Sequence, residues 1–226
     1  GLAKGEFISI LNSDDVYTTD RFEKILAFQK INNSAAIITD VIPISDDGEI
    51  FEDPNFGWNV WHKKNRDYYQ KCGDIYSGFL KGNFMVTTSN LFMTREAVEK
   101  VGEFCSLRYL HDYDYIFRLM LNFPDKVQYM YDDKLLYYRI HDGNTLGEAA
   151  ILGREQDKKV IKKYMLAIIP DKYRQFAESG SERLVELEQE LHDVRNLLHP
   201  KQQPKGVRPA AKELASALKL YIKKKF

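Results

Sequence analysis

Cysteine is scarce in this chain of 226 residues. Only Cys72 and Cys105 are present, and they lack the paired spacing of a zinc site. Two free thiols are typical of a reducing compartment, so we expect a cytoplasmic protein. No run of 18 apolar residues occurs, and no transmembrane helix is therefore expected. The first residues, GLAKGEF, contain neither an initiator Met nor the apolar segment of a signal peptide, and we expect the chain to belong to a longer one.

The formal net charge is zero, but the charge is unevenly distributed. Residues 201–226 contain eight Lys or Arg and one Glu, which gives this tail a net charge of +7 and the other 200 residues −7. Because the acidic body has no basic stripe, no nucleic-acid partner is expected. The basic amphipathic helix predicted over 209–226 suits the anionic inner surface of a membrane, and it equally suits a solvated helix end.

Strand and helix patterns alternate along residues 1–165. Apolar residues 7–11 predict a buried strand, and a Thr/Asp cap signal then begins a helix. Residues 51–80 have no clear period and predict a loop with short helices. We expect further extended segments at 35–39, 84–94, 127–131 and 135–140, and further helices at 95–101 and 112–121. This mixture predicts an α/β domain, in which ligands bind beyond the carboxyl ends of strands.

After residue 180 the apolar spacing changes to steps of three and four. Residues 166–200 are expected to form a helical extension with a short heptad seam, and 201–226 a linker followed by the basic helix. The seam predicts either helical self-association through 184–198 or an amphipathic helix packed on the body, and both interpretations stay open. Its members are Leu184, Leu187, Leu191, Val194 and Leu198.

Two adjacent carboxylates, Asp14 and Asp15, follow the first predicted strand in ISILNSDDVY. Paired oxygen ligands can hold a hard divalent cation, and such a cation can stabilise the charge of a departing diphosphate. Aspartates are equally typical of turns and helix N-caps. This stretch alone leaves the metal site and the turn as alternatives.

Two further sets of polar residues lie at the ends of predicted helices or strands. Asp112 and Asp114, with His111, precede an apolar helix, where acids suit the helix dipole and an Asp can also act as a general base. In YYRIHDGNT, Arg139 and His141 end a strand and enter a loop. His141 is a candidate metal ligand or phosphate contact, or it is structural.

The order of the motifs is more specific than any one of them. GEFISILNSDDVYTTDRF, GNFMVTTSNLFMTREAVEKVGEF, LRYLHDYDYIFRLML and LLYYRIHDGNT follow one another along the chain. Together they resemble the second half of a family-2 glycosyltransferase of the GT-A fold, over about residues 1–165. That family has an Asp-x-Asp-like strand end, a VG-x-F segment before an acidic pair, and a YR-x-H motif. The resemblance implies a partial GT-A mixed sheet flanked by helices, which would be the metal and acceptor half of the catalytic domain.

The resemblance also implies roles for single residues. Asp14 matches the final Asp of the Asp-x-Asp motif, the usual ligand of Mg²⁺ or Mn²⁺ on the donor diphosphate. Asn12 and Ser13, just before it, would bind the donor. Asp112 matches the base that removes the proton from the acceptor hydroxyl in inverting members. His141 matches the loop histidine near the diphosphate and would be a second metal ligand.

Other positions depart from the family pattern. Asn12 stands where the first Asp often is, and His111 replaces the common Glu of the acidic pair. The resemblance places His111 near the acceptor. In the aromatic segment 51–80, Trp58 and Trp61 are candidates for stacking on an acceptor sugar, with a core or lid role as the alternative.

The function implied is transfer of a sugar from a nucleotide-sugar donor to a glycan or lipid-linked acceptor, with inversion. The family's early motifs for the nucleotide, PxYN-like and DDGS-like, do not occur, so we expect most of the nucleotide-binding half to be missing. A non-catalytic, transferase-like scaffold or interaction module is the alternative, and Asn12 and His111 favour it.

Overall fold

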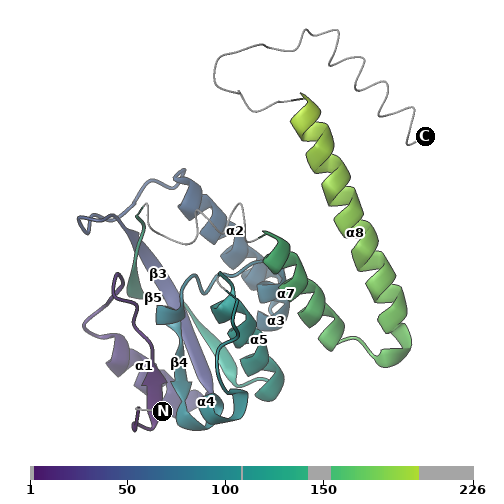
Figure 1. Ribbon diagram of the computed structural model, residues 1–226. Coiled ribbons are helices and arrows are strands. Elements are labelled where there is room, and N and C mark those ends of the chain that lie inside the picture. The colour runs from purple at the N-terminus through teal and green to yellow at the C-terminus, as the bar shows by residue number, and fades with distance from the viewer. Residues whose placement is uncertain (1–2, 108, 142–153, 199–226) are drawn as a thin grey trace, which may run out of the picture. The chain divides into compact units, whose positions relative to one another are not determined.

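The computed structural model describes residues 3–107, 109–141 and 154–198. Its contacts divide the chain into two units, Gly1–Met165 and Leu166–Phe226. The first unit contains the sheet and all the motifs described above (Figure 1). Within it, the expected α/β fold with a mixed sheet flanked by helices is confirmed.

The sheet has five strands in the order β1-β4-β3-β5-β2. Only the central pair, β3 and β5, is parallel, and the other three pairings are antiparallel. The strands are β1 (Phe7–Ser9), β2 (Val16–Tyr17), β3 (Ala36–Ile44), β4 (Phe92–Thr94) and β5 (Val127–Arg139). The register of the parallel pair brings Ile44 beside Arg139, so both central strands end at the same edge of the sheet.

Both faces of the central strands are covered, which is why β3 reads as a nearly continuous apolar run. Ile37 packs with Ile25 of α1 on one face, while Ile38 packs on the other face with the residues of α3, α4, α5 and α7 (Figure 1). The helices of this unit are α1 (Arg21–Asn32), α2 (Gly57–Cys72), α3 (Ile75–Lys81), α4 (Arg95–Val101), α5 (His111–Asn122) and α7 (Arg154–Ala167).

The structures predicted for two segments in the middle of the chain are wrong. Within residues 51–80, predicted as a loop with short helices, the structure has the 16-residue helix α2 from Gly57 to Cys72 and then α3 from Ile75. Residues 84–94 are extended only at β4, and the 3-10 helix η1 (Thr88–Asn90) interrupts them. Val86 has φ 77°, a left-handed conformation that a β-branched residue rarely adopts, and the chain therefore turns there instead of continuing as a strand.

The strands predicted at 127–131 and 135–140 are one strand, β5. Its register with β3 shifts on either side of Asp40, and Asp132 has φ 71°. The Arg66 guanidinium forms ion pairs with both of these carboxylates, the one with Asp132 at 2.9 Å. Arg66 thus binds both the buried Asp40 and the exposed Asp132 at the irregularity.

The second unit contains the helix α8 (Asp171–Leu198). No helix within the described residues has both the length and the apolar character needed to cross a bilayer. The predicted linker and basic helix of 201–226, with the membrane contact at 209–226, lie outside the described residues.

Candidate functional site

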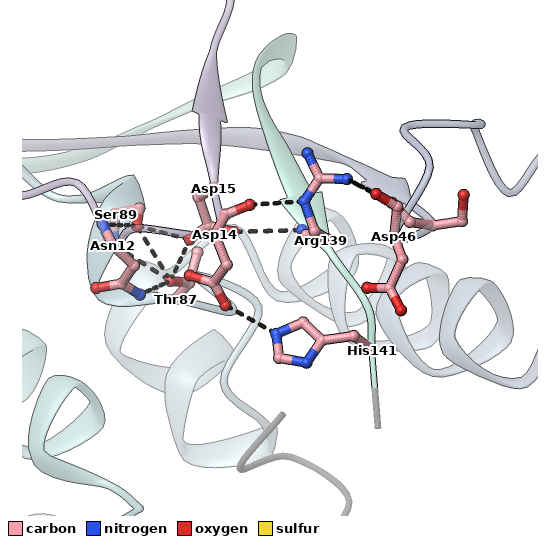
Figure 2. A network of polar contacts seen from close by, with 9 residues as sticks. Asn12, Asp14, Asp15, Asp46, Thr87, Ser89, Arg139 and His141 are labelled. Carbon is pink, nitrogen blue, oxygen red and sulfur yellow. Dashed lines mark hydrogen bonds and ion pairs between the residues drawn. The ribbon is translucent and has the colours of Figure 1, made fainter. Parts of the chain in front are cut away.

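The pairing of β2 with β5 positions the NSDD turn. Val16 lies opposite Tyr137, so the residues before Val16 run alongside the end of β5. Arg139 fixes this arrangement: its Nε donates to the Asp14 carbonyl at 3.0 Å, and its Nη1 donates to the carbonyls of Ser45 and Asp46 at 2.7 Å each (Figure 2). The motifs NSDD and YRIH, far apart in sequence, therefore meet at one edge of the sheet.

Asp15 points into the protein. Its Oδ2 accepts hydrogen bonds from Ser89 Oγ at 2.6 Å and Thr87 Oγ1 at 3.0 Å, and its Oδ1 accepts from the Arg139 amide at 3.3 Å. Burial raises the pKa of this carboxyl, while the three hydrogen bonds act in the opposite direction. Asp15 therefore fastens the turn to η1 and to β5.

Asp14 points the other way and is half exposed. Its Oδ2 lies 3.1 Å from Nε2 of His141 (Figure 2). Two ligand atoms at neighbouring positions of an octahedral ion, with bonds of about 2.1 Å, are also about 3 Å apart. The pair therefore fits a divalent cation, and a carboxylate with an imidazole suits Mn²⁺ better than Mg²⁺. Within the described ranges no group of three or more His, Cys, Asp or Glu could hold a metal, so further ligands would come from a substrate or water.

Asn12 and Ser13 are exposed at the same turn. The Asn12 amide Nδ2 donates to Thr87 Oγ1 at 3.0 Å, and the Asn12 backbone amide donates to Ser89 Oγ at 2.9 Å. The side chain of Asn12 is thereby held beside Asp14. A carboxylate at this position could not donate to Thr87.

The acidic end of α5 is connected to this edge through η1. Thr88 Oγ1 lies 3.4 Å from Nε2 of His111, and its neighbour Thr87 bonds to Asn12 and Asp15. The adjacent residues Thr87 and Thr88 thus connect the NSDD turn with the first turn of α5.

Asp112 is almost completely buried in that turn. Burial raises the pKa of its carboxyl, and the nearby His111 opposes the rise. Asp112 Oδ1 accepts the Tyr113 amide at 2.7 Å, and the side chain of Asn83 also bonds to it. Asn83 Oδ1 is buried, and it has no hydrogen-bond partner among the residues that the structure describes. Asp112 therefore stands next to an acceptor atom that a hydroxyl group could satisfy.

The second acid of this turn, Asp114, is structural. Its carboxylate accepts hydrogen bonds from Tyr164 Oη at 2.6 Å, Lys163 Nζ at 2.8 Å and Arg118 Nε at 2.8 Å. These cationic and hydroxyl donors lower the pKa of Asp114 against the effect of its burial. The two acids of one helical turn thus have opposite environments.

The two tryptophans lie on α2. The ring of Trp58 stacks on His62 at 4.7 Å and on Tyr138 at 6.0 Å, and it packs against the core group that contains Val86. Trp61 is more exposed, at 37%. The packing of Trp58 fits the core alternative, whereas the exposed ring of Trp61 leaves room for a ligand.

The motifs alone did not identify the hydroxyl-rich centre of the site. Thr87, Thr88 and Ser89 contact residues more than twenty positions away, and Asn83 bonds to Asp112. A signal was present, because TTSN is a polar run inside the otherwise apolar segment FMVTTSNLFMT. In a continuous strand, such a run would have buried polar groups without partners.

The fold and the site define an α/β domain with polar residues collected at strand ends. No protein-family model and no curated protein matches the chain. Among solved structures, S. aureus TarS 1–349 in complex with UDP-GlcNAc is similar, with a TM-score of 0.49 at 14% identity, covering 77% of this chain and 47% of that one. S. aureus TarS gives a TM-score of 0.47 at 12% identity, covering 79% of this chain and 28% of that one. This chain spans less than half the length of those chains.

Proposed function

We propose that this chain carries the metal and acceptor part of an inverting glycosyltransferase with a nucleotide-sugar donor. The observation that most supports this is the edge where Asp14 lies beside His141 and where the turn around Asp14 is connected, through Thr87 and Thr88, to the first turn of α5. One carboxylate there is half exposed beside an imidazole, and the other is buried with a raised pKa. Carboxyl groups in such different environments are suited to different tasks in one reaction.

The donor end is formed by the NSDD turn. Asp14 and His141 would hold Mg²⁺ or Mn²⁺, which when bound supplies positive charge to a leaving diphosphate. Arg139 holds the Asp14 backbone in place, and Asn12 and Ser13 are exposed beside it to contact the donor.

The acceptor end is the first turn of α5. Asp112 would accept the proton of an acceptor hydroxyl while that oxygen attacks the anomeric carbon and the bond to the nucleotide diphosphate breaks. Its raised pKa makes it a stronger base than an exposed aspartate. Asn83 Oδ1 beside it, which lacks a partner within the described part of the chain, can accept a hydrogen bond from the incoming sugar. A glycan or a lipid-linked glycan, with Trp61 and His111 close to the sugar, is the acceptor that we propose.

Calorimetric titration of the chain with Mn²⁺ and UDP tests the donor end. UDP is the nucleotide part of the ligand in the TarS complex. We expect Asp14→Ala to weaken joint binding by about 10-fold or more, since loss of one metal ligand removes a charge-assisted contact. Asp47→Ala, an exposed acid on the adjacent turn, is the matched control and should bind like the parent chain.

The acceptor end is tested by Asp112→Asn. This variant should bind Mn²⁺ and UDP like the parent chain but lose release of sugar from a UDP-sugar. Unchanged binding in Asp14→Ala, or sugar release by Asp112→Asn equal to that of the parent chain, would contradict the proposal.

A non-catalytic module is the second candidate. Its supporting observation is that the polar groups of the site have partners within the chain: Asn12 bonds to Thr87, and Asp14 lies beside His141. Such a module should bind neither Mn²⁺ nor UDP, and Asp14→Ala should then leave its properties unchanged.

A further inference from the structure

Helix α8 carries an apolar stripe that the proposed function does not use. Leu184 is 65% exposed, Leu191 56% and Leu187 39%. Every residue from 182 to 189 is exposed, so this part of the helix gains little from packing. Arg183 forms ion pairs along the helix with Glu186 at 3.2 Å and Glu190 at 3.7 Å. Such exposed pairs contribute only a few tenths of a kcal/mol each, which leaves the helix marginal without a partner.

The spacing of the stripe indicates what kind of partner fits it. Leu184 and Leu191 occupy a positions of a heptad, and Leu187 and Val194 occupy the d positions. A stripe with this period matches a second helix of the same period, because each side chain then inserts between four others. We propose that α8 forms a parallel, two-stranded coiled coil with α8 of a second copy of this chain.

Charge complementarity favours the parallel orientation. In the same heptad frame Arg183 and Glu190 are at g positions, and Glu188 is at an e position. A parallel pair brings g of one helix beside the following e of the other, so Arg183 meets Glu188 of the second copy. An antiparallel pair with the same four apolar layers would instead bring Glu188 beside Glu188. The charges thus favour the parallel orientation of the two helices, and the leucines stabilise the dimer.

This inference does not depend on the proposed function. Sedimentation of the full chain over a range of concentrations tests it, and a dimer is the expected result. Leu187→Glu and Leu191→Glu should each raise the dissociation constant by about 100-fold or more, since each removes two buried leucines per dimer. Val185→Glu is the matched control: it changes an exposed apolar residue at a b position, off the seam, and should leave the dimer intact.

A charge exchange and a crosslink test the orientation. Arg183→Glu should weaken the dimer, and adding Glu188→Arg should restore it. A cysteine introduced by Leu187→Cys should crosslink to its own copy under mild oxidation, because a d position faces itself only in a parallel, in-register pair. The parent chain, with Cys72 and Cys105, gives the background. A monomer at all concentrations, a trimer, a dimer insensitive to Leu187→Glu, or a dimer without the Leu187→Cys crosslink would overturn the proposal.

Discussion

At the scale of residues, two neighbouring carboxylates have opposite surroundings. Asp15 is 5% exposed and is hydrogen-bonded to η1 and β5, while the side chain of Asp14 is 39% exposed beside His141. Removing a partner from buried hydroxyl and amide groups costs more than removing an exposed charge, since the buried groups then lose both water and their acceptor. The turn therefore combines one aspartate that stabilises the fold, Asp15, with one that is accessible to a ligand, Asp14.

Substitution of these two acids should separate the roles. We expect Asp15→Ala to lower the free energy of unfolding by about 2–3 kcal/mol, because Thr87 and Ser89 lose their acceptor in the interior. Asp14→Ala should lower it by less than about 1 kcal/mol. Urea denaturation of both variants measures the difference. Equal losses in the two variants would show that the carboxylates share one role.

Buried His62 should make the fold sensitive to acid. Burial, and then the charge of Arg66, lowers the pKa of His62 to about 4. Between pH 6.5 and 4 the unfolded chain therefore binds a proton that the folded chain does not, and stability falls as the pH falls through this range. From pH 7.5 to 5.0 the parent chain should lose about 2 kcal/mol more than His62→Gln, as measured by urea denaturation at both values. Parallel losses in the two chains would contradict this.

The sequence could suggest Asp14 but not the environment that distinguishes it from Asp15. The partners Thr87 and Ser89 lie more than 70 residues further along the chain, and no local pattern encodes such a contact. Similarly, the sequence indicated that both aspartates of the HDYD segment could act in chemistry. The hydrogen bond from Tyr164 shows that Asp114 is structural. The assignment of single residues to tasks came from tertiary contacts.

At the scale of elements, α7 is held on α5 by one buried acid. Tyr164 is almost completely buried, and its hydroxyl donates to both the carboxylate and the carbonyl of Asp114. Its ring stacks on Phe117 at 4.4 Å. The contact thus fixes α7 against the same helical turn that carries Asp112.

Tyr164→Phe should lower the free energy of unfolding by about 1.5–3 kcal/mol, because the ring stays while a buried hydrogen bond to a charged group is lost. Lys163→Gln is the matched control, since Lys163 bonds to the same Asp114 oxygen but is 59% exposed, and it should cost less than about 1 kcal/mol. Urea denaturation again provides the measurement. A larger loss for Lys163→Gln than for Tyr164→Phe would contradict this account.

Elements with a clear apolar period were predictable, and those without it were not. The α4 helix was predicted correctly, with Gly102 at its end at a positive φ of 79°. The α2 helix was missed because only His62 and Asn65 of its 16 residues are buried, and both are polar. For β5, the polar residues at its register shift suggested a break between two strands. In both cases tertiary packing, which a local pattern does not record, decided the structure.

At the scale of the whole molecule, the described core belongs to the first unit. The three groups of buried apolar residues extend no further along the chain than Tyr164, and the contacts divide after Met165.

A chain of residues 1–165 should therefore unfold cooperatively at nearly the same urea concentration as the full chain. We expect the two free energies of unfolding to agree within about 0.5 kcal/mol at a concentration where both chains are monomeric. It should also sediment as a monomer at every concentration, since it lacks α8. Circular dichroism with urea measures the first expectation and sedimentation the second. If residues 1–165 fail to fold, the second unit contributes to the core of the first. If they fold but still dimerise, self-association is a property of the sheet unit, and α8 is not needed for it.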